Sequence, residues 1–417
     1  MVKEQHKIYS RSLSYFAWQR LKKNKLAVLG MYVIGISFIV AILGSLIRPD
    51  GTPMANEMLL QYTTKEPGFN GKLLLIRKNK KSDTPGFFNR MFFGGKESDF
   101  TEIPVKNYWF EGYDIAVEQY TGIKDHQKLI AKYNIADVVY PIDFNNRFNN
   151  ETGKGYLEFS VLDGEKLTRS VEELRKEITD NHIITKIYLL GTDRFGRDML
   201  SRLMSGTLVS LSVGFISVFI SLVIGVLFGA IGGYYRGKTD DVIVWLINVV
   251  WSIPTLLLVI AITMALGKGF WQVFIAVGLT MWVEVARVVR GQILSVREKD
   301  FVEAGKALGF SNARLLFKHV LPNVMGPVIV ISAANFASAI LIEAGLSFLG
   351  IGAQPPMASW GTMIRDHYGY IITGKAYLAI FPGLAIMFMV LAFMLVGNGL
   401  RDALDTKEVD DNEIVTY

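Results

Sequence analysis

The 417-residue chain contains no cysteine, which excludes a disulfide framework and metal sites built on thiolates. Histidine is scarce, and its five copies are scattered without the spacing of a metal site. Neither paired carboxylates nor a serine–histidine arrangement stands out as a basis for catalysis. We therefore expect a chain that is not an enzyme and that binds no metal or cofactor of its own.

Hydrophobic residues are abundant, at 51% of the chain, although 20% of the residues are charged. Polar and apolar segments must therefore be separated along the sequence, as in a membrane protein. Six apolar runs approach the roughly 20 residues that a membrane-spanning helix needs: 26–47, 208–234, 242–266, 270–289, 324–348 and 377–400. The first has full membrane length and no nearby cleavage site, so we expect an uncleaved anchor. Pro254 should kink the third.

Lysine and arginine are concentrated in residues 1–25 and 290–323, with Arg236 and Lys238 between the second and third apolar runs. Because these residues favour the cytoplasmic side of a membrane, we expect both termini and the 290–323 loop to be cytoplasmic. The chain would then be a multi-pass protein of the bacterial cytoplasmic (inner) membrane, in contact with membrane lipid. An acidic cytoplasmic tail follows at 407–417.

Residues 48–190, called the insert below, separate the first two apolar runs. The insert mixes strand-like runs with one helix-like run and with Gly, Pro and Asn turns, which predicts an α+β domain on the outer side. The strand-like runs are 72–77, 156–162 and 183–190, and the helix-like run is 171–179. Its acidic and basic residues nearly balance, which argues against a nucleic-acid partner. It is either a scaffold against neighbouring subunits or a surface that receives a solute-binding protein.

Residues 297–323, called the hook below, predict a pair of short cytoplasmic helices. Asp300 can cap the first helix, and Gly309 can end it. Ser311 can cap the second, which Pro322 should stop. The first helix would expose small and apolar residues on one face: Phe301, Ala304, Gly305 and Leu308. Such a face requires a docking partner.

The run Gly232–Thr239 fits the phosphate-binding pattern G-x-x-x-x-G-K-[ST]. A phosphate-binding loop must follow a buried strand, whereas this run follows one long apolar segment and precedes another. We therefore expect a short cytoplasmic turn. The alternative is a self-sufficient membrane ATPase that uses Lys238.

Residues 191–202 should begin a helix at Thr192 or Asp193 that leads into the second apolar run. Helical spacing would then form three i,i+4 ion pairs: Asp193–Arg197, Arg194–Asp198 and Asp198–Arg202.

Five motifs, taken together and in this order, resemble the C-type permease subunit of dipeptide and oligopeptide ABC importers: 191–202, 301–323, 343–350, 355–361 and 397–405. The hook resembles the EAA loop by which such a permease engages its ATPase, with Gly305 where alanine is usual. Asn398 and Thr406 depart from the usual Asp and Pro of the last motif. The resemblance is close over 190–407, loose over 1–48, and excludes most of the insert.

The resemblance implies an all-α polytopic membrane protein with about six transmembrane helices in the type I ABC importer permease fold, carrying an α+β extracytoplasmic insert. Its parts would be a cytoplasmic segment, a first transmembrane helix, the insert, a permease core of five transmembrane helices with the ATPase-coupling hook, and the acidic tail: 1–25, 26–47, 48–190, 191–406 and 407–417. The implied function is translocation of di- or oligopeptides. Another small solute, such as a nickel chelate, and a membrane-anchored sensor remain alternatives.

The implied partners are a homologous second permease subunit, ABC ATPase subunits that bind ATP and Mg, and an extracytoplasmic solute-binding protein. The predicted ATPase-coupling residues lie in the hook: Glu303, Ala304, Gly305, Gly309, Leu321 and Pro322. Candidate pathway residues are polar positions within apolar runs: Asn248, Ser252, Asn335, Ser338 and Glu343. For Glu343, a local structural role is the alternative to contact with cargo.

Overall fold

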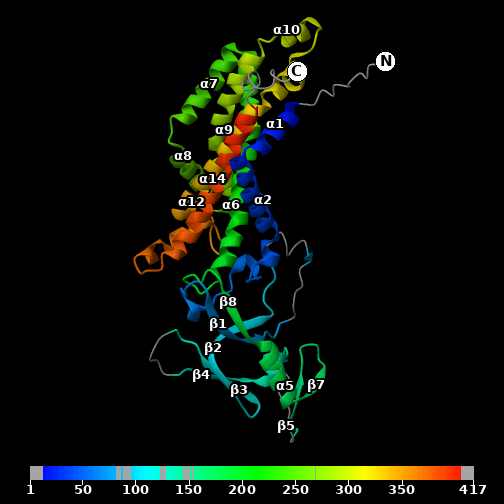
Figure 1. Ribbon diagram of the computed structural model, residues 1–417, viewed down its shortest axis with the longest axis vertical. Coiled ribbons are helices and arrows are strands. Elements are labelled where there is room, and N and C mark those ends of the chain that lie inside the picture. The colour runs from blue at the N-terminus through cyan, green and yellow to red at the C-terminus, as the bar shows by residue number, and fades with distance from the viewer. Residues whose placement is uncertain are drawn as a thin grey trace, which may run out of the picture.

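The computed structural model describes residues 13–80, 86–87, 95–122, 128–143, 151–152, 155–267 and 269–404. Residues 1–12 of the predicted cytoplasmic segment and the acidic tail at 407–417 lie outside this range. The molecule is elongated, with long helices in one half and two small sheets at the opposite end (Figure 1). The expected fold class, a helical membrane protein with a sheet-containing insert, is confirmed.

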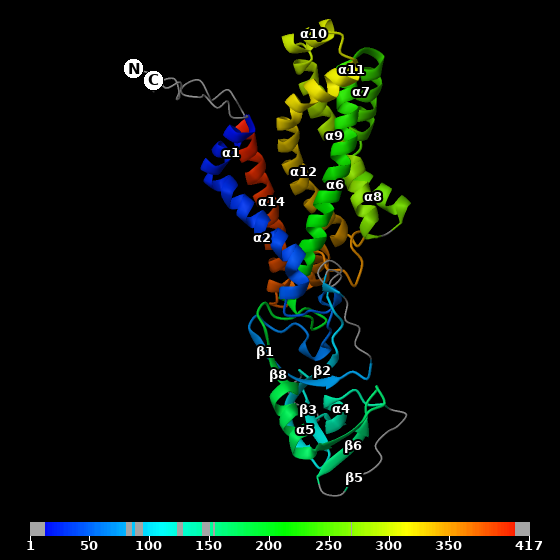
Figure 2. The ribbon, with the colours of Figure 1, turned by 90° about the vertical axis from the view of Figure 1, so that its right-hand side faces the viewer.

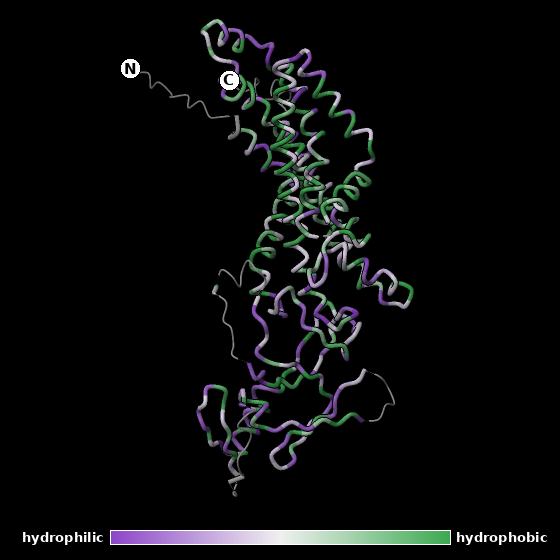
Figure 3. The backbone as a smooth tube through the Cα atoms, turned by 180° about the vertical axis from the view of Figure 1, so that it is seen from behind, coloured by the Kyte–Doolittle hydropathy of each residue, from purple (hydrophilic) through white to green (hydrophobic). Residues whose placement is uncertain are grey.

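Five helical segments are long and apolar enough to cross a membrane in the part of the chain that the structure describes. They are α2 (Lys25–Ile47), α6 (Met199–Tyr235), α9 (Phe270–Val296), the helical segment that ends in α12 (Met325–Phe348), and α14 (Tyr377–Leu404). A shorter helix, α1 (Leu13–Lys23), precedes α2 and lies beside the end of α14. Hydrophobic residues predominate along these helices, whereas hydrophilic residues are frequent in the insert (Figure 3).

The predicted span at 242–266 is not a single helix. It is a pair, α7 (Gly237–Trp251) and α8 (Thr255–Leu266), bent by 90° at the break. Pro254 has no N–H to continue the helix, and the Ser252 hydroxyl donates to the carbonyl of Val249 at 2.8 Å. The expected kink is therefore a right-angle bend between two separate helices. A break at membrane depth is tolerated where protein or a water-filled cavity surrounds it.

Close packing of α6 against α9 depends on a row of glycines one helical turn apart. A Cβ atom on Gly225 would lie 2.5 Å from the Cβ of Val285, and one on Gly229 would lie 2.5 Å from the carbonyl oxygen of Ala286. Gly233 makes a similar approach to α9. Small residues at this spacing let two membrane helices approach closely and gain dispersion energy along their length.

The insert contains two antiparallel sheets. The larger has the strand order β4-β3-β2-β1-β8 and the smaller β5-β6-β7. The strands are β1 (Phe69–Arg77), β2 (Phe100–Glu111), β3 (Asp114–Gln119), β4 (Ile130–Asn134), β5 (Glu151–Thr152), β6 (Tyr156–Ser160), β7 (Lys166–Ser170) and β8 (Ile183–Tyr188). Two short helices, α4 (Ile135–Val139) and α5 (Val171–Glu177), share an apolar core with the strands.

The predicted strand-like runs of the insert coincide with β1, β6 and β8, and the helix-like run with α5 and the wide turn that follows it. Ser170 and Glu173 form a reciprocal capping box at the start of α5. The strands β2, β3, β4, β5 and β7 were not predicted. Burial along β2 and β3 does not alternate from one residue to the next, so these two strands lack the simple pattern that identifies a half-buried strand.

Replacing Gly229 with leucine should force α6 and α9 apart, because the new side chain would begin in contact with the backbone of α9. Overpacking of this kind costs about 1–3 kcal/mol or more. We expect a lower apparent melting temperature of the purified protein in detergent. Gly35→Leu is the matched control, since nothing lies within 4 Å of a Cβ at that position. Equal melting temperatures for the two variants would contradict the tight contact.

Candidate functional site

The hook lies at the end of the molecule opposite the insert, as the separation of α10 from the sheets shows (Figure 2). Its first helix, α10 (Asp300–Ala307), ends before Gly309, whose φ of +77° is the left-handed conformation that glycine allows. The second, α11 (Asn312–Arg314), begins after Ser311, whose hydroxyl accepts a hydrogen bond from the backbone N–H of Arg314. The predicted end of the first helix and the cap of the second are confirmed.

Two other predictions about the hook were wrong. Asp300 is the first residue of α10, and Lys299 precedes the helix without a side-chain cap. Pro322 does not stop the second helix, because helical backbone continues through a wide turn at Leu315–Val320 and a tight turn at Leu321–Val324 into α12. Pro322 lies in the first turn of the tight segment, the part of a helix that tolerates proline best.

Gly305 lies on the inner face of α10, contrary to the predicted exposed face. A Cβ at Gly305 would lie 2.6 Å from the end of the Leu315 side chain. Val302 is buried on the same side. The outward face instead presents Glu303, Ala304 and Leu308, which is 74% exposed. Gly305 therefore lets α10 pack against the wide turn that follows α11, and it does not itself form the outward face.

Polar contacts tie the hook to the cytoplasmic ends predicted for α6 and α7. Tyr234 at the end of α6 donates its hydroxyl hydrogen to the Asn312 side chain at 3.1 Å, and Arg297 donates to the carbonyl of Tyr234. Arg290 forms a two-pronged ion pair with Asp240 of α7, at 2.5 and 2.6 Å. The hook is thus bonded directly to the end of α6, while Arg290, near the end of α9, holds α9 to α7 just before the hook begins.

The run Gly232–Thr239 joins α6 to α7, and Arg236 has a φ of +59° between them. A helix, and not a strand, precedes it. The expected turn is present, and the arrangement that a phosphate-binding loop requires is not found in this described segment.

The candidate pathway residues separate into two groups. Asn248, Ser252 and Ser338 are exposed on the bundle, whereas Asn335 and Glu343 are each only 1% exposed. Glu343 accepts a hydrogen bond from the Ser347 hydroxyl at 2.6 Å, one turn further along α12. This contact favours the local structural role for Glu343. Only the first group borders open space in this conformation.

A cavity of about 200 Å³ lies where the α7–α8 break meets α9 and α12. Ser338 contributes to its wall, as do Trp251, Thr255 and Glu284. Glu284 was not among the predicted site residues. It lies within the apolar run at 270–289, and a charged residue in such a run is the sequence signal that would have identified it.

Residues 191–198 do not begin a helix, contrary to prediction. They form a tight turn before α6, and Asp198 caps that helix by accepting the backbone N–H of Ser201 at 2.8 Å. The predicted Asp193–Arg197 pair is present at 2.6 Å, but within the turn. The other two predicted pairs are replaced: Arg194 pairs with Asp366 at 3.5 Å, and Arg202 donates to the carbonyls of Met54 and Pro356.

We call this turn the clamp, because residues 191–198 join the start of the insert to its end. The backbone N–H of Thr64 donates to the carbonyl of Asp193 at 2.9 Å, and Thr192 donates to that of Lys65 at 3.0 Å. Gly196 approaches Leu59 so closely that a Cβ would lie 1.8 Å from its carbonyl oxygen. The chain therefore leaves the helical bundle and returns to it at one place.

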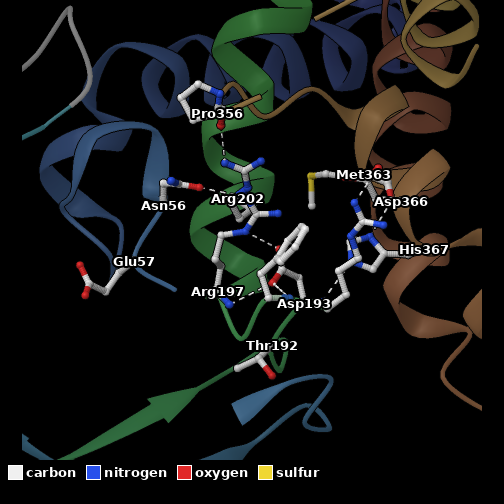
Figure 4. A network of polar contacts seen from close by, with 12 residues as sticks. Asn56, Glu57, Thr192, Asp193, Arg197, Arg202, Pro356, Met363, Asp366 and His367 are labelled. Carbon is white, nitrogen blue, oxygen red and sulfur yellow. Dashed lines mark hydrogen bonds and ion pairs between the residues drawn. The ribbon is translucent and has the colours of Figure 1, made fainter. Parts of the chain in front are cut away.

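The clamp also contacts α13 (Trp360–His367), which belongs to the helical part (Figure 4). The backbone N–H of Arg194 donates to Nε2 of His367 at 3.3 Å, and Nδ1 of that ring lies 2.7 Å from the carbonyl of Met363. These partners suit a neutral ring that donates from Nδ1. Burial lowers the pKa of His367 and so favours the same neutral form.

Asp198 completes a short polar chain between the insert and α6. The backbone N–H of Asp50 donates to the Ser201 hydroxyl at 2.9 Å, and that hydroxyl donates to the Asp198 carboxylate. Burial raises the pKa of Asp198, although the hydrogen bonds from Ser201 act in the opposite direction. Together with the Asp193–Arg197 pair, these contacts seat the insert on the bundle.

Comparison with known proteins matches most of the helical part. The family model described as "Binding-protein-dependent transport system inner membrane component" matches residues 205–409. A second model, "N-terminal TM domain of oligopeptide transport permease C", matches residues 12–61. Residues 62–204 fall between the two matches.

Curated relatives include the oligopeptide transport system permease protein OppC of Bacillus subtilis, 40% identical over 54% of this chain and 73% of the relative. The dipeptide transport system permease protein DppC of Alkalihalophilus pseudofirmus is 42% identical over 52% of this chain and 71% of the relative. The glutathione transport system permease protein GsiD of Pectobacterium atrosepticum is 39% identical over 52% of this chain and 72% of the relative. A solved structure of the inward-facing MetNI methionine ABC transporter is 19% identical, with a TM-score of 0.42 over 50% of this chain and 98% of that chain.

The clamp predicts a position-specific effect of adding one methyl group. Gly196→Ala should lower the melting temperature, because its left-handed backbone and its contact with Leu59 both resist a side chain. Gly164→Ala is the matched control: its φ is also positive, but nothing lies within 4 Å. In both variants the left-handed backbone should cost about 1–3 kcal/mol of stability. Only Gly196→Ala should add a steric clash with Leu59. Limited proteolysis should then cut between insert and bundle only in Gly196→Ala; equal behaviour of the two would contradict the clamp.

Proposed function

Since the chain belongs to the family of binding-protein-dependent transport system inner membrane components, we propose that it is the ABC importer permease subunit through which di- or oligopeptides cross the membrane. The observation that carries this proposal is the match over α6 to α14, which includes the hook and the α7–α8 break. Relatives of about 40% identity are named for oligopeptide, dipeptide and glutathione transport. All three cargoes are short chains of amino acids.

The proposed orientation places both termini and the hook in the cytoplasm and the insert outside. The hook and the end of α14 lie on the same side of the bundle, opposite the sheets (Figure 1). The lysine and arginine residues near these ends support the cytoplasmic assignment. A homologous second permease subunit would complete the pathway, because the exposed side-chain amide of Asn248 is unfavourable against lipid.

In the proposed cycle, separate ATPase subunits bind ATP and Mg and dock on the outward face of the hook. Ala304 and its neighbours Glu303 and Leu308 would form this contact, while Gly305 keeps α10 close to the wide turn that follows α11. Closure of the ATPases would move the hook, and α9 would transmit the movement because it runs directly into residue 297. ATP would thus shift the population between outward-open and inward-open states by binding them unequally.

The insert would lie beside the outer opening of the pathway, where a solute-binding protein delivers cargo. Its seat on α6 and α13 through the clamp supports a fixed position relative to the helices. We propose that it contacts the binding protein or the second permease subunit and that it performs no chemistry.

Uptake by intact cells tests the proposed cargo. A strain that lacks this subunit should lose uptake of labelled di- and oligopeptides, and the wild-type gene should restore it. Restoration of nickel-chelate uptake but not of peptide uptake would replace the proposed cargo and keep the permease. A normal uptake of all these solutes in the deletion strain would instead favour the sensor.

The docking face predicts that Ala304→Trp uncouples transport. The side chain at 304 points outward, so a tryptophan there should leave the hook folded while it blocks the ATPase. We expect at least about tenfold less ATPase to co-purify, since losing a buried anchor contact typically costs 2 kcal/mol or more. Glu165→Trp, at an exposed turn of the insert, is the control. Normal co-purification and uptake in Ala304→Trp would refute the docking face.

Gly305→Ala provides the complementary test. The added methyl group meets only the flexible end of Leu315, which can move aside. ATPase binding and uptake should therefore remain near wild type, whereas a loss as large as that of Ala304→Trp would show that Gly305 itself touches the partner.

A further inference from the structure

Glu284 places an ionisable group midway along α9, a helix otherwise apolar enough to cross the membrane. Its side chain is exposed on the bundle. Within the described residues its carboxylate takes part in no ion pair or hydrogen bond. A carboxylate at this depth is unfavourable in lipid, so this face of α9 must adjoin water or another protein surface.

The surroundings of Glu284 are those of a binding site and not of a surface helix. The cavity of about 200 Å³ beside it is lined by the aromatic ring of Trp251 and by three hydroxyl side chains, Thr255, Thr280 and Ser338. Together with Glu284 these side chains come from three parts of the chain: the two sides of the α7–α8 break, α9 and α12. The remainder of the lining is mostly apolar. A few polar groups converging in an apolar hollow are typical of small-molecule sites.

Arg287, one helical turn beyond Glu284, does not neutralise it. The Arg287 guanidinium lies 3.4 Å from the centre of the Trp251 ring and is held there by a cation–π contact. The two side chains of opposite charge are therefore kept apart, although their i,i+3 spacing would allow them to pair. Glu284 is left available to a cation from outside the chain.

We propose that this cavity is one half of a cargo-binding site inside the membrane, in which the Glu284 carboxylate binds the cationic amino terminus of a peptide. The proposal rests on the proposed function. An amino terminus is common to all unblocked peptides, so its recognition is compatible with many side chains. The cavity is smaller than the roughly 300–1,000 Å³ of a typical ligand pocket. It can hold one end of the cargo, and the second permease subunit would enclose the rest.

The position of Glu284 on α9 also connects the site to the hook. The helix that carries the carboxylate ends at Val296, immediately before the hook begins. Movement of the hook by the ATPases would displace the carboxylate relative to Trp251 and Thr255 on the α7–α8 pair. Affinity for the cation would then differ between the two states of the importer, as release of cargo requires.

The test uses the complete importer, with its ATPases and binding protein, reconstituted in lipid vesicles. Uptake of labelled dialanine is compared with that of N-acetyl-dialanine, which lacks the amino-terminal charge. Glu284→Gln should reduce uptake of dialanine by at least about tenfold, in the range of one charged hydrogen bond, and should leave N-acetyl-dialanine unchanged. The same binding protein delivers both peptides to the wild type and to the variant. The ratio of wild-type to variant uptake, taken for each peptide separately, is therefore independent of which peptide the binding protein prefers.

Two further variants make the result decisive. Glu284→Asp keeps the negative charge and should retain most of the dialanine uptake that Glu284→Gln loses. This comparison tests the need for the charge even if the wild type does not transport the acetylated peptide. Asp241→Asn removes an exposed carboxylate near the start of α7, away from the cavity, and should change neither uptake. Equal uptake of dialanine by Glu284→Gln and wild type would overturn the inference.

Assembly provides the remaining distinction. If the second permease subunit fails to co-purify with Glu284→Gln, the carboxylate is an ion-pair partner between subunits and the cargo role is refuted. If the wild-type importer takes up neither peptide, the proposed peptide cargo itself fails. Peptide uptake by the wild type together with an unaffected variant refutes only the role of Glu284.

Discussion

The close contact between α6 and α9 is the interaction on which the other parts of the molecule depend. Gly225, Gly229 and Gly233 remove the side chains that would separate the two helices. Both helices reach the functional regions. The first, α6, begins at the clamp and carries Tyr234 in its last turn, where this residue bonds to the hook. The second, α9, carries Glu284 and continues into the hook. Because the pair is tightly packed, a displacement at the hook must be shared by both helices.

Two ion pairs that hold parts of this protein together contrast with the carboxylate for which we propose an outside partner. Asp193 and Arg197 are almost fully buried and bonded to each other, and Arg290 is bonded to Asp240. Breaking such a buried pair is costly because one charge is left without a partner. Glu284, by contrast, is exposed in the membrane-spanning part without a partner among the described residues. This difference separates structural charges from the candidate for recognition.

The features predictable from the sequence are those determined by local composition. Apolar length alone located five continuous spans, and the residues Gly309 and Ser311 located the ends of the hook helices, because a left-handed glycine and a capping hydroxyl act within one turn. The features that the sequence did not predict depend on contacts between residues far apart in the chain. Thr192 pairs with Lys65, more than a hundred residues away, and this pairing replaces the helix that local charge spacing indicated. The burial of Gly305 likewise depends on Leu315, in the wide turn that follows the second helix of the hook.

The side-by-side arrangement of the two ends of the insert has a consequence for how this protein can vary. Thr64 and Lys65, where the chain enters the sheets, are hydrogen-bonded to Asp193 and Thr192, where it returns. Since this joint fixes both chain ends before α6 begins, the length and structure of what lies between them have little influence on the helices. The insert is therefore an exchangeable module: evolution, or an engineer, can shorten, replace or transplant it at the clamp while the transport machinery beneath keeps its geometry.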